Sequence, residues 1–210
     1  MYIGDYLGRR TIYSPDALAI VDAGKTPELR LSFAQLNERA NRLAHWLRET
    51  AGVGKGDRVA MLALDGVEHL DVLFACGKLG AIHTALNWRL HWRELQQILA
   101  EVTPSVLVYD DTFQDSMAQL AQEETPIRHW IHLDGIGIPG SLHYGYALDA
   151  VPATPCACET LVEEDIAAIV FTGGTTGLPK GAQISHRQIA WNCLNSVIHD
   201  VGRGDVYLNV

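Results

Sequence analysis

The 210-residue chain has little positive charge. Its 16 lysines and arginines are outnumbered by 25 aspartates and glutamates, which gives a formal net charge of -9. Proteins that bind nucleic acids concentrate positive charge on one face, and we find no basic cluster of that kind in this sequence. The charge balance therefore argues against nucleic acid as a partner.

Long apolar runs, a secretory signal and abundant cysteine are also lacking. No apolar run approaches the roughly 20 residues that cross a bilayer. Residues 1–6 have neither the basic nor the apolar region of a signal peptide. Four cysteines in a chain of this length, without an export signal, indicate reduced thiols. We therefore expect a cytoplasmic protein with no transmembrane segment.

The composition is that of a folded protein. Hydrophobic residues make up 48% of the chain and charged residues 20%, which excludes disorder, collagen and a coiled coil. A chain of this size buries roughly 70% of the surface that its unfolded form exposes, enough for a substantial core.

Helical and extended patterns alternate along the chain. Two sequences are typical of capping boxes, Ser32 with Gln35 and Ser185 with Gln188. Helices are predicted over about 33–49, 67–79, 92–101, 112–122 and 186–199. Strands are predicted over about 58–64, 81–86, 105–109, 129–133, 166–171 and 181–184. Because parallel neighbours need crossover connections, this order predicts an α/β fold with mostly parallel sheets and helices on both faces.

Two segments depart from this alternation. Residues 134–163 hold many glycines and prolines and are predicted to be an irregular excursion. Residues 206–210 resemble the start of a strand. An α/β domain rarely stops in this way, so we expect the chain to be a fragment of a longer protein.

The most informative segment is Phe171-Thr-Gly-Gly-Thr-Thr-Gly-Leu-Pro-Lys-Gly181, which follows an apolar strand. Its glycines leave backbone N–H groups open to an anion, and its threonines add hydroxyl donors. Lys180 supplies a cation for a polyphosphate. A flexible turn is the plain alternative, but the fixed order of these residues favours phosphate binding. The segment does not fit the Walker pattern, because Pro179 precedes the lysine and Gly181 follows it.

With this loop, the sequence resembles the adenylate-forming superfamily of acyl-CoA synthetases, peptide-synthetase adenylation domains and luciferases. The phosphate-loop signature of that family matches residues 171–181, with Gly173 where serine is commoner, as in fatty-acyl-CoA synthetases. Segments 31–44, 54–60, 78–81 and 86–95 resemble the family as well, with Trp88 where proline is usual. The resemblance covers essentially the whole chain, as the N-terminal portion of the AMP-binding domain.

The resemblance implies a two-step ligase. A carboxylic acid, expected to be a fatty acid, attacks the α-phosphate of Mg-ATP to give an acyl-adenylate and pyrophosphate, and coenzyme A then displaces AMP. The residues expected to hold ATP or pyrophosphate are Thr172, Gly173, Gly174, Thr175, Thr176, Gly177 and Lys180. The magnesium ligands, the nucleoside site and the mobile C-terminal domain are expected beyond residue 210. No metal ligand is expected within the chain.

Other functions stay open. A close alternative is an adenylation domain that loads an amino or aryl acid onto a carrier protein. If the short chain is natural, it could instead be a non-catalytic nucleotide- or phosphate-binding module. If it is a fragment, we expect no turnover by the chain alone, and self-association through the apolar surface left by the missing half.

Weaker patterns favour plain interpretations. Residues 135–140 form a G-x-G-x-x-G, the one hint of an NAD-dependent oxidoreductase, but Pro139 interrupts it and a poor helix follows. Cys156 and Cys158, with His143 nearby, are too few for a metal site. His129 and His132 fall on opposite faces of a strand. His186 is interpreted as a helix-start residue at least as readily as a substrate contact. The tryptophans at 88, 92, 130 and 191 are expected in the core or an interface.

Overall fold

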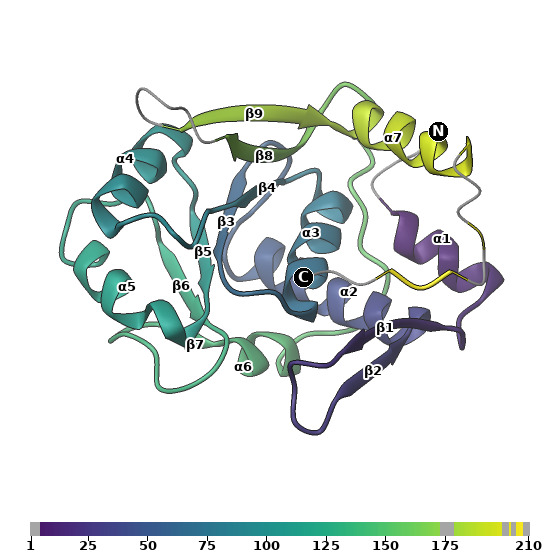
Figure 1. The fold of residues 1–210 in the computed structure, drawn as a ribbon, viewed down its shortest axis with the longest axis horizontal. Coiled ribbons are helices and arrows are strands. Elements are labelled where there is room, and N and C mark those ends of the chain that lie inside the picture. The colour runs from purple at the N-terminus through teal and green to yellow at the C-terminus, as the bar shows by residue number, and fades with distance from the viewer. Residues whose placement is uncertain (1–4, 173–178, 199–201, 203–204, 208–210) are drawn as a thin grey trace.

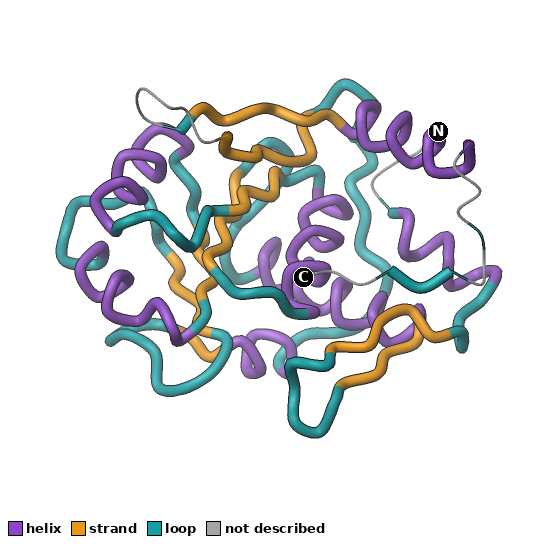
Figure 2. Tube along the Cα trace, in the orientation of Figure 1, coloured by secondary structure: helices purple, strands orange, loops and turns teal. Residues whose placement is uncertain are grey.

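The computed structural model describes residues 5–172, 179–198, 202 and 205–207. A seven-stranded sheet runs through the molecule, and a separate two-stranded ribbon lies beside it (Figures 1 and 2). The strand order of the large sheet is β7-β6-β5-β3-β4-β8-β9. All neighbours in it are parallel except β8 and β9, which pair antiparallel at one edge. The expected α/β fold with a mostly parallel sheet is confirmed.

Apart from β7 and α6, the strands and helices of the large sheet lie where they were predicted, with small shifts at their ends. The strands are β3 (Arg58–Leu62), β4 (Ile82–Ala85), β5 (Val106–Tyr109), β6 (His129–His132), β7 (Leu142–His143), β8 (Ile166–Thr172) and β9 (Lys180–Ser185). The helices are α2 (Phe33–Glu49), α3 (Val67–Leu79), α4 (Trp92–Val102), α5 (Gln114–Leu120, after a 3₁₀ turn at Asp111–Phe113), α6 (Tyr144–Asp149) and α7 (His186–Ile198).

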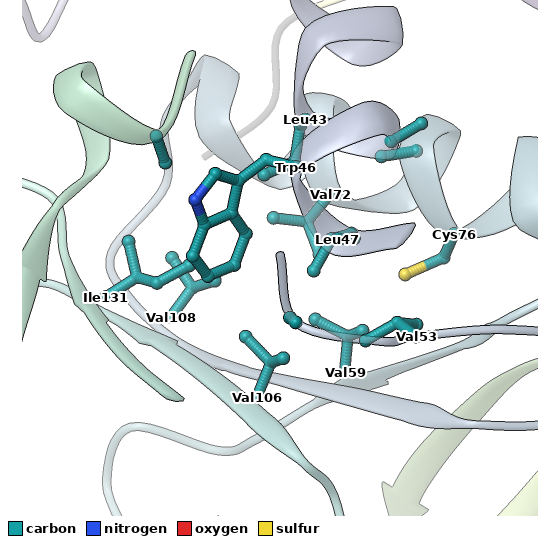
Figure 3. Close-up of a cluster of buried hydrophobic side chains, with 14 of the residues drawn as sticks. Leu43, Trp46, Leu47, Val53, Val59, Val72, Cys76, Val106, Val108 and Ile131 are labelled. Atoms are coloured by element: carbon teal, nitrogen blue, oxygen red, sulfur yellow. The ribbon is translucent and has the colours of Figure 1, made fainter. Parts of the chain in front are cut away.

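Both faces of the sheet are covered because successive residues of the buried strands point to opposite sides. Val106 and Val108 of β5 face α2 and α3. They share a buried cluster with Leu43 and Trp46 from α2 (Figure 3). Leu107, on the other face of β5, packs with apolar residues of α4 and α5. The near-continuous apolar runs of β3 and β5 are explained by this double burial.

Helix caps follow the predicted residues. The Ser32 side chain accepts from the Gln35 N–H, and the Gln35 side chain accepts from the Ser32 N–H. Ser185 and Gln188 form the same reciprocal pair at the start of α7. Each pair satisfies two of the backbone donors that a helix leaves free at its first turn.

The N-terminal elements and part of the Gly/Pro-rich segment were not predicted. The structure has α1 (Tyr6–Tyr13) and an antiparallel pair of β1 (Leu18–Asp22) and β2 (Leu29–Ser32). Within 134–163, predicted to be irregular, β7 extends the sheet and α6 packs against α2. The strand expected at 206–210 is not seen at residues 205–207, and its last three residues lie outside the described part.

A buried polar network holds α6 in place. The Arg39 guanidinium on α2 pairs with the Asp71 carboxylate on α3, with Nη2 2.6 Å from Oδ2. The Tyr144 hydroxyl on α6 donates to the same Oδ2 at 2.9 Å. Asp71 is fully buried, so this pairing is what makes its burial tolerable.

No helix in the described part of the chain is both long and apolar enough to span a bilayer.

Candidate phosphate-binding site

The ends of the β8–β9 hairpin bring Thr172 and Lys180 together. Thr172 is the last residue of β8, Lys180 is the first of β9, and the two are paired across the strands. The Thr172 hydroxyl donates to the Lys180 carbonyl oxygen at 3.3 Å. The other expected phosphate-binding residues, Gly173, Gly174, Thr175, Thr176 and Gly177, lie outside the described residues. The hairpin therefore fixes where their segment begins and ends.

Packing at the base of the hairpin fixes its register. Phe171 packs against the core cluster on the α4 side of the sheet. A Cβ added at Gly181, directly across from Phe171, would lie 2.9 Å from Ile169 Cγ2 and 3.2 Å from Phe171 Cε1. Such distances leave no room for a side chain. The last glycine of the motif thus allows the two strands to close beneath the loop.

Lys180 differs from the other lysines in its electrostatic partners. The sequence has four lysines, and the ammonium groups of three are ion-paired: Lys25 with Glu68 at 3.2 Å, Lys55 with Asp165 at 2.6 Å and Lys78 with Asp5 at 2.6 Å. Lys180 is exposed and pairs with no carboxylate of the described residues. Its charge is available to an anion at the end of the hairpin.

A basic and aromatic segment lies at the same edge of the sheet. β4 is parallel to β8, with Ala85 opposite Val170, so the chain leaving β4 starts beside the end of β8. There the Arg89 guanidinium stacks on the Trp88 ring, 4.1 Å from its centroid. Asn87 fixes this turn by accepting from the Arg89 N–H at 3.0 Å. Sequence reasoning did not single out Arg89, although Trp-Arg pairs at 88–89 and 92–93 are a visible signal in an acidic chain.

Carboxyl ends of parallel strands are where open α/β sheets bind ligands. The end of β8 and the end of β4 are adjacent at this edge, and they offer one lysine and one arginine. The arrangement suits an anionic ligand.

The weaker sequence patterns do not form competing sites. The glycines at 135, 137 and 140 adopt positive φ, but Gly140 is followed by β7, and no helix opens from the turn as dinucleotide binding requires. Burial raises the pKa of Cys156, which keeps its thiol protonated. Among the described residues, no three histidine, cysteine or acidic side chains are placed to hold a metal ion.

His186 and the tryptophans are placed as follows. His186 is the buried first residue of α7, and its backbone N–H donates to the Asp165 carbonyl. Trp92 and Trp130 pack against the core. Trp88 and Trp191 are 42% and 60% exposed, so neither is a core residue, and an interface position for these two stays a prediction.

The sequence pattern of the family described as "AMP-binding enzyme" matches residues 9–210. The chain belongs to this family. Membership of the AMP-binding enzyme family agrees with the resemblance found in the hairpin motif.

Curated relatives in the AMP-binding family act on several acids. A feruloyl-CoA synthase of Amycolatopsis is 34% identical over 196 residues, covering 93% of this chain and 36% of the relative. An indoleacetate–CoA ligase of Aromatoleum aromaticum is 34% identical over 215 residues, covering 98% of this chain and 39% of the relative. The chain thus spans little more than a third of the length of these relatives.

Solved structures share the fold. An anthranilate CoA ligase in complex with anthranoyl-AMP superposes with a TM-score of 0.81 at 26% identity, over 88% of this chain and 35% of that one. A Mycobacterium tuberculosis fatty acyl CoA synthetase superposes with a TM-score of 0.77 at 29% identity, over 88% and 34%. The α/β fold of the AMP-binding enzymes is thereby shown for this chain.

Proposed function

We propose that the loop between Thr172 and Lys180 binds the β- and γ-phosphates of ATP during activation of a carboxylic acid. The observation that carries this proposal is the hairpin base. It holds a threonine hydroxyl and a lysine with no carboxylate partner among the described residues, on either side of a segment rich in glycine and threonine. Gly173, Gly174, Thr175, Thr176 and Gly177 supply backbone and hydroxyl donors in the proposal.

The chemistry explains why such a loop is needed. Attack of a carboxylate on the α-phosphate expels pyrophosphate, so negative charge grows on the leaving group in the transition state. Donors and cations that are already in position stabilise this charge more than water does, because they need not reorganise. Lys180 supplies the cation, and Arg89 at the neighbouring strand end adds positive charge at the same edge of the sheet.

A further part of the proposal, which family membership supports, concerns the products of the reaction. We propose that the activity is an AMP-forming acid–CoA ligase, in which an acyl-adenylate forms and the thiol of coenzyme A displaces AMP. The names of the curated relatives support coenzyme A over a carrier-protein thiol. Magnesium accompanies ATP as a substrate complex, and the described residues provide no ligand cluster for it.

The acid is a separate part of the proposal. The curated relatives are named for ferulate, indoleacetate and carnitine or crotonobetaine, whereas one structural neighbour is a fatty acyl CoA synthetase. The fatty-acid preference rests on Gly173 in the motif and stays a prediction.

Calorimetric titration of the 210-residue chain with pyrophosphate and with ATP tests the phosphate-binding role. A contact between an ammonium and a phosphate contributes about 1.5–3 kcal/mol, so Lys180→Ala should weaken binding by about tenfold or more. Arg187→Ala is the matched control, because Arg187 is an exposed cation at the start of α7 whose ion pair with Glu164 is 3.6 Å long.

Equal affinities of the wild-type chain and Lys180→Ala for pyrophosphate would refute the proposed role of the loop. Equal losses in both variants would show a general effect of net charge instead. Release of pyrophosphate from ATP and a panel of fatty and aromatic acids, measured with the same chains, tests the separate expectation that the 210-residue chain does not turn over alone.

A further inference from the structure

A cavity lies at the other end of the strand order from the phosphate-binding hairpin. It has a volume of about 490 Å³ and lies where β6 and β7 end, whereas the hairpin is formed by β8 and β9 at the other end of that order. Its lining includes His132, Ser141, His143, Tyr146 and Asp149. The activity proposed above uses none of these residues.

Hydrogen bonds around Ser141 fix the protonation of His132. The Ser141 hydroxyl donates its single proton to the Ile138 carbonyl at 2.7 Å, and the Tyr109 hydroxyl donates to Ser141 Oγ at 3.3 Å. His132 Nδ1 lies 2.9 Å from the same Oγ and must therefore be a donor. In the neutral ring this leaves Nε2 as an acceptor. Burial, and then the neighbouring His143, lower the pKa of His132, which favours the neutral ring.

His143 has the opposite arrangement. Its Nδ1 accepts from the Gly145 N–H at 3.1 Å, so the proton of the neutral ring is on Nε2. The cavity is thus lined by one imidazole whose Nε2 accepts and one whose Nε2 donates. A metal ion would need unprotonated nitrogens from both rings, and the described residues offer no third ligand. This pattern suits an organic ligand better than a metal.

Aromatic rings shape the cavity. The His132 and His143 rings meet edge to face with centroids 5.3 Å apart at 76°, and His143 and Tyr146 meet with centroids 5.4 Å apart at 62°. Tyr146 is 69% exposed, so its ring is available to a further partner. Offset and edge-to-face contacts of this kind favour a planar aromatic ligand.

The charge of the cavity is negative. Among the described residues that line it, Asp149 carries a carboxylate and none is a lysine or an arginine. Asp149 follows Tyr146 by three residues on α6, so both side chains lie on one face of this short helix. A ligand that places its ring against Tyr146 would bring a positively charged group near Asp149.

We propose that this cavity binds a small aromatic amine, with its ring against His143 and Tyr146, its ammonium group at Asp149 and a ring donor on His132 Nε2. The site is separate from the phosphate-binding hairpin, and its occupancy does not depend on ATP or on the proposed ligase activity.

Calorimetric titration of the 210-residue chain with tyramine tests the proposal. The matched compound is 4-hydroxyphenylacetate, which has the same ring and hydroxyl but carries a carboxylate. We expect tyramine to bind at least about tenfold more tightly. Asp149→Asn should remove most of this preference, and Tyr146→Leu should weaken the binding of tyramine by about threefold or more. Both positions are exposed, so both variants should fold.

Two controls make the outcome specific. Glu101→Gln removes an exposed carboxylate from α4, and Lys180→Ala alters the phosphate-binding hairpin; both should leave tyramine affinity unchanged. Absence of tyramine binding, equal affinity for the two compounds, or a preference that survives Asp149→Asn would each overturn the proposal. A loss in Glu101→Gln equal to that in Asp149→Asn would overturn it too, because it would reflect net charge alone.

Discussion

Gly181 is a residue whose role in the motif comes from packing. A methyl group at this position would approach Ile169 and Phe171 more closely than ordinary contacts allow. Gly181→Ala gains about 0.4–1 kcal/mol from the smaller entropy of the unfolded chain. Overpacking costs about 1–3 kcal/mol, so the variant should be less stable overall. We expect its thermal midpoint to fall by a few degrees.

Gly54→Ala is the control for this measurement. The nearest atom to an added Cβ at Gly54 is Asp57 Oδ2 at 3.9 Å, an ordinary contact distance. This variant should be as stable as the wild type or slightly more so. If Gly181→Ala were equally stable, the close contacts at the hairpin base would not constrain its register.

At the scale of single residues, local motifs were predictable and long-range partners were not. The order of glycine, threonine and lysine in residues 171–181 predicts a phosphate loop, and phosphate binding stays a prediction. In the structure Thr172 and Lys180 are paired at the base of that segment. The structure alone shows that Lys180 has no carboxylate partner among the described residues, whereas the other three lysines form ion pairs. Lys78 pairs with Asp5, 73 residues away, and no sequence pattern indicates such a pair.

At the scale of elements, the buried network links three helices through Asp71. Burial raises the pKa of the Tyr144 hydroxyl well above its ordinary value, so this group stays protonated and donates to the Asp71 carboxylate. Tyr144→Phe removes that donor and leaves the buried charge with the Arg39 guanidinium alone. Hydrogen bonds to charged groups contribute about 1.5–3 kcal/mol, and the unfolding free energy should fall by about this amount.

Urea denaturation measures this loss, and Tyr146→Phe is the matched control on the same helix. The Tyr146 side chain is largely exposed, so removal of its hydroxyl should change stability by no more than about 0.5 kcal/mol. A Tyr144→Phe protein as stable as the control would mean that the hydroxyl does not support Asp71.

Elements with a strong periodic pattern were predictable. The range predicted for α2, 33–49, agrees with Phe33–Glu49, because a capping box and an apolar face both mark it. α1 was not predicted, because only Leu7 of its eight residues is buried and one buried position does not mark an apolar helix face in the sequence. β7 has two residues and α6 has six, which is too few to show a periodic pattern of apolar residues. Tertiary contacts stabilise them instead: β7 pairs with β6, and α6 packs against α2.

At the scale of the whole molecule, α7 carries exposed apolar side chains along one face. Trp191, Leu194 and Ile198 are exposed on α7 at a spacing that places them on one side of the helix. Sequence reasoning expected such a surface, but its place on α7 depends on how the helix packs. Self-association through this face stays a prediction.

The stability of the whole molecule should depend on pH through His83, which lies buried in β4. Desolvation, and then the nearby His69, lower the pKa of His83 from 6.5 to about 4. Above pH 6.5 the ring is neutral in both the folded and the unfolded chain. As the pH falls from 6.5 toward 4, the unfolded chain binds a proton at His83 and the folded chain does not, so folding becomes less favourable.

The difference between the two pKa values corresponds to about 3 kcal/mol, at about 1.4 kcal/mol for each pKa unit. Other histidines with lowered pKa values, His129, His132 and His186, act in the same direction, so the wild-type profile alone does not isolate the contribution of His83.

The variant His83→Leu removes the contribution of His83 to the pH dependence of stability. In urea denaturation between pH 7.5 and pH 4, the wild type should lose up to about 3 kcal/mol relative to this variant. The exposed His91→Asn should follow the wild type, because asparagine can also cap α4. A gap between wild type and His83→Leu that stays constant with pH would show that His83 is protonated equally in both states, and burial in β4 would then not control its charge.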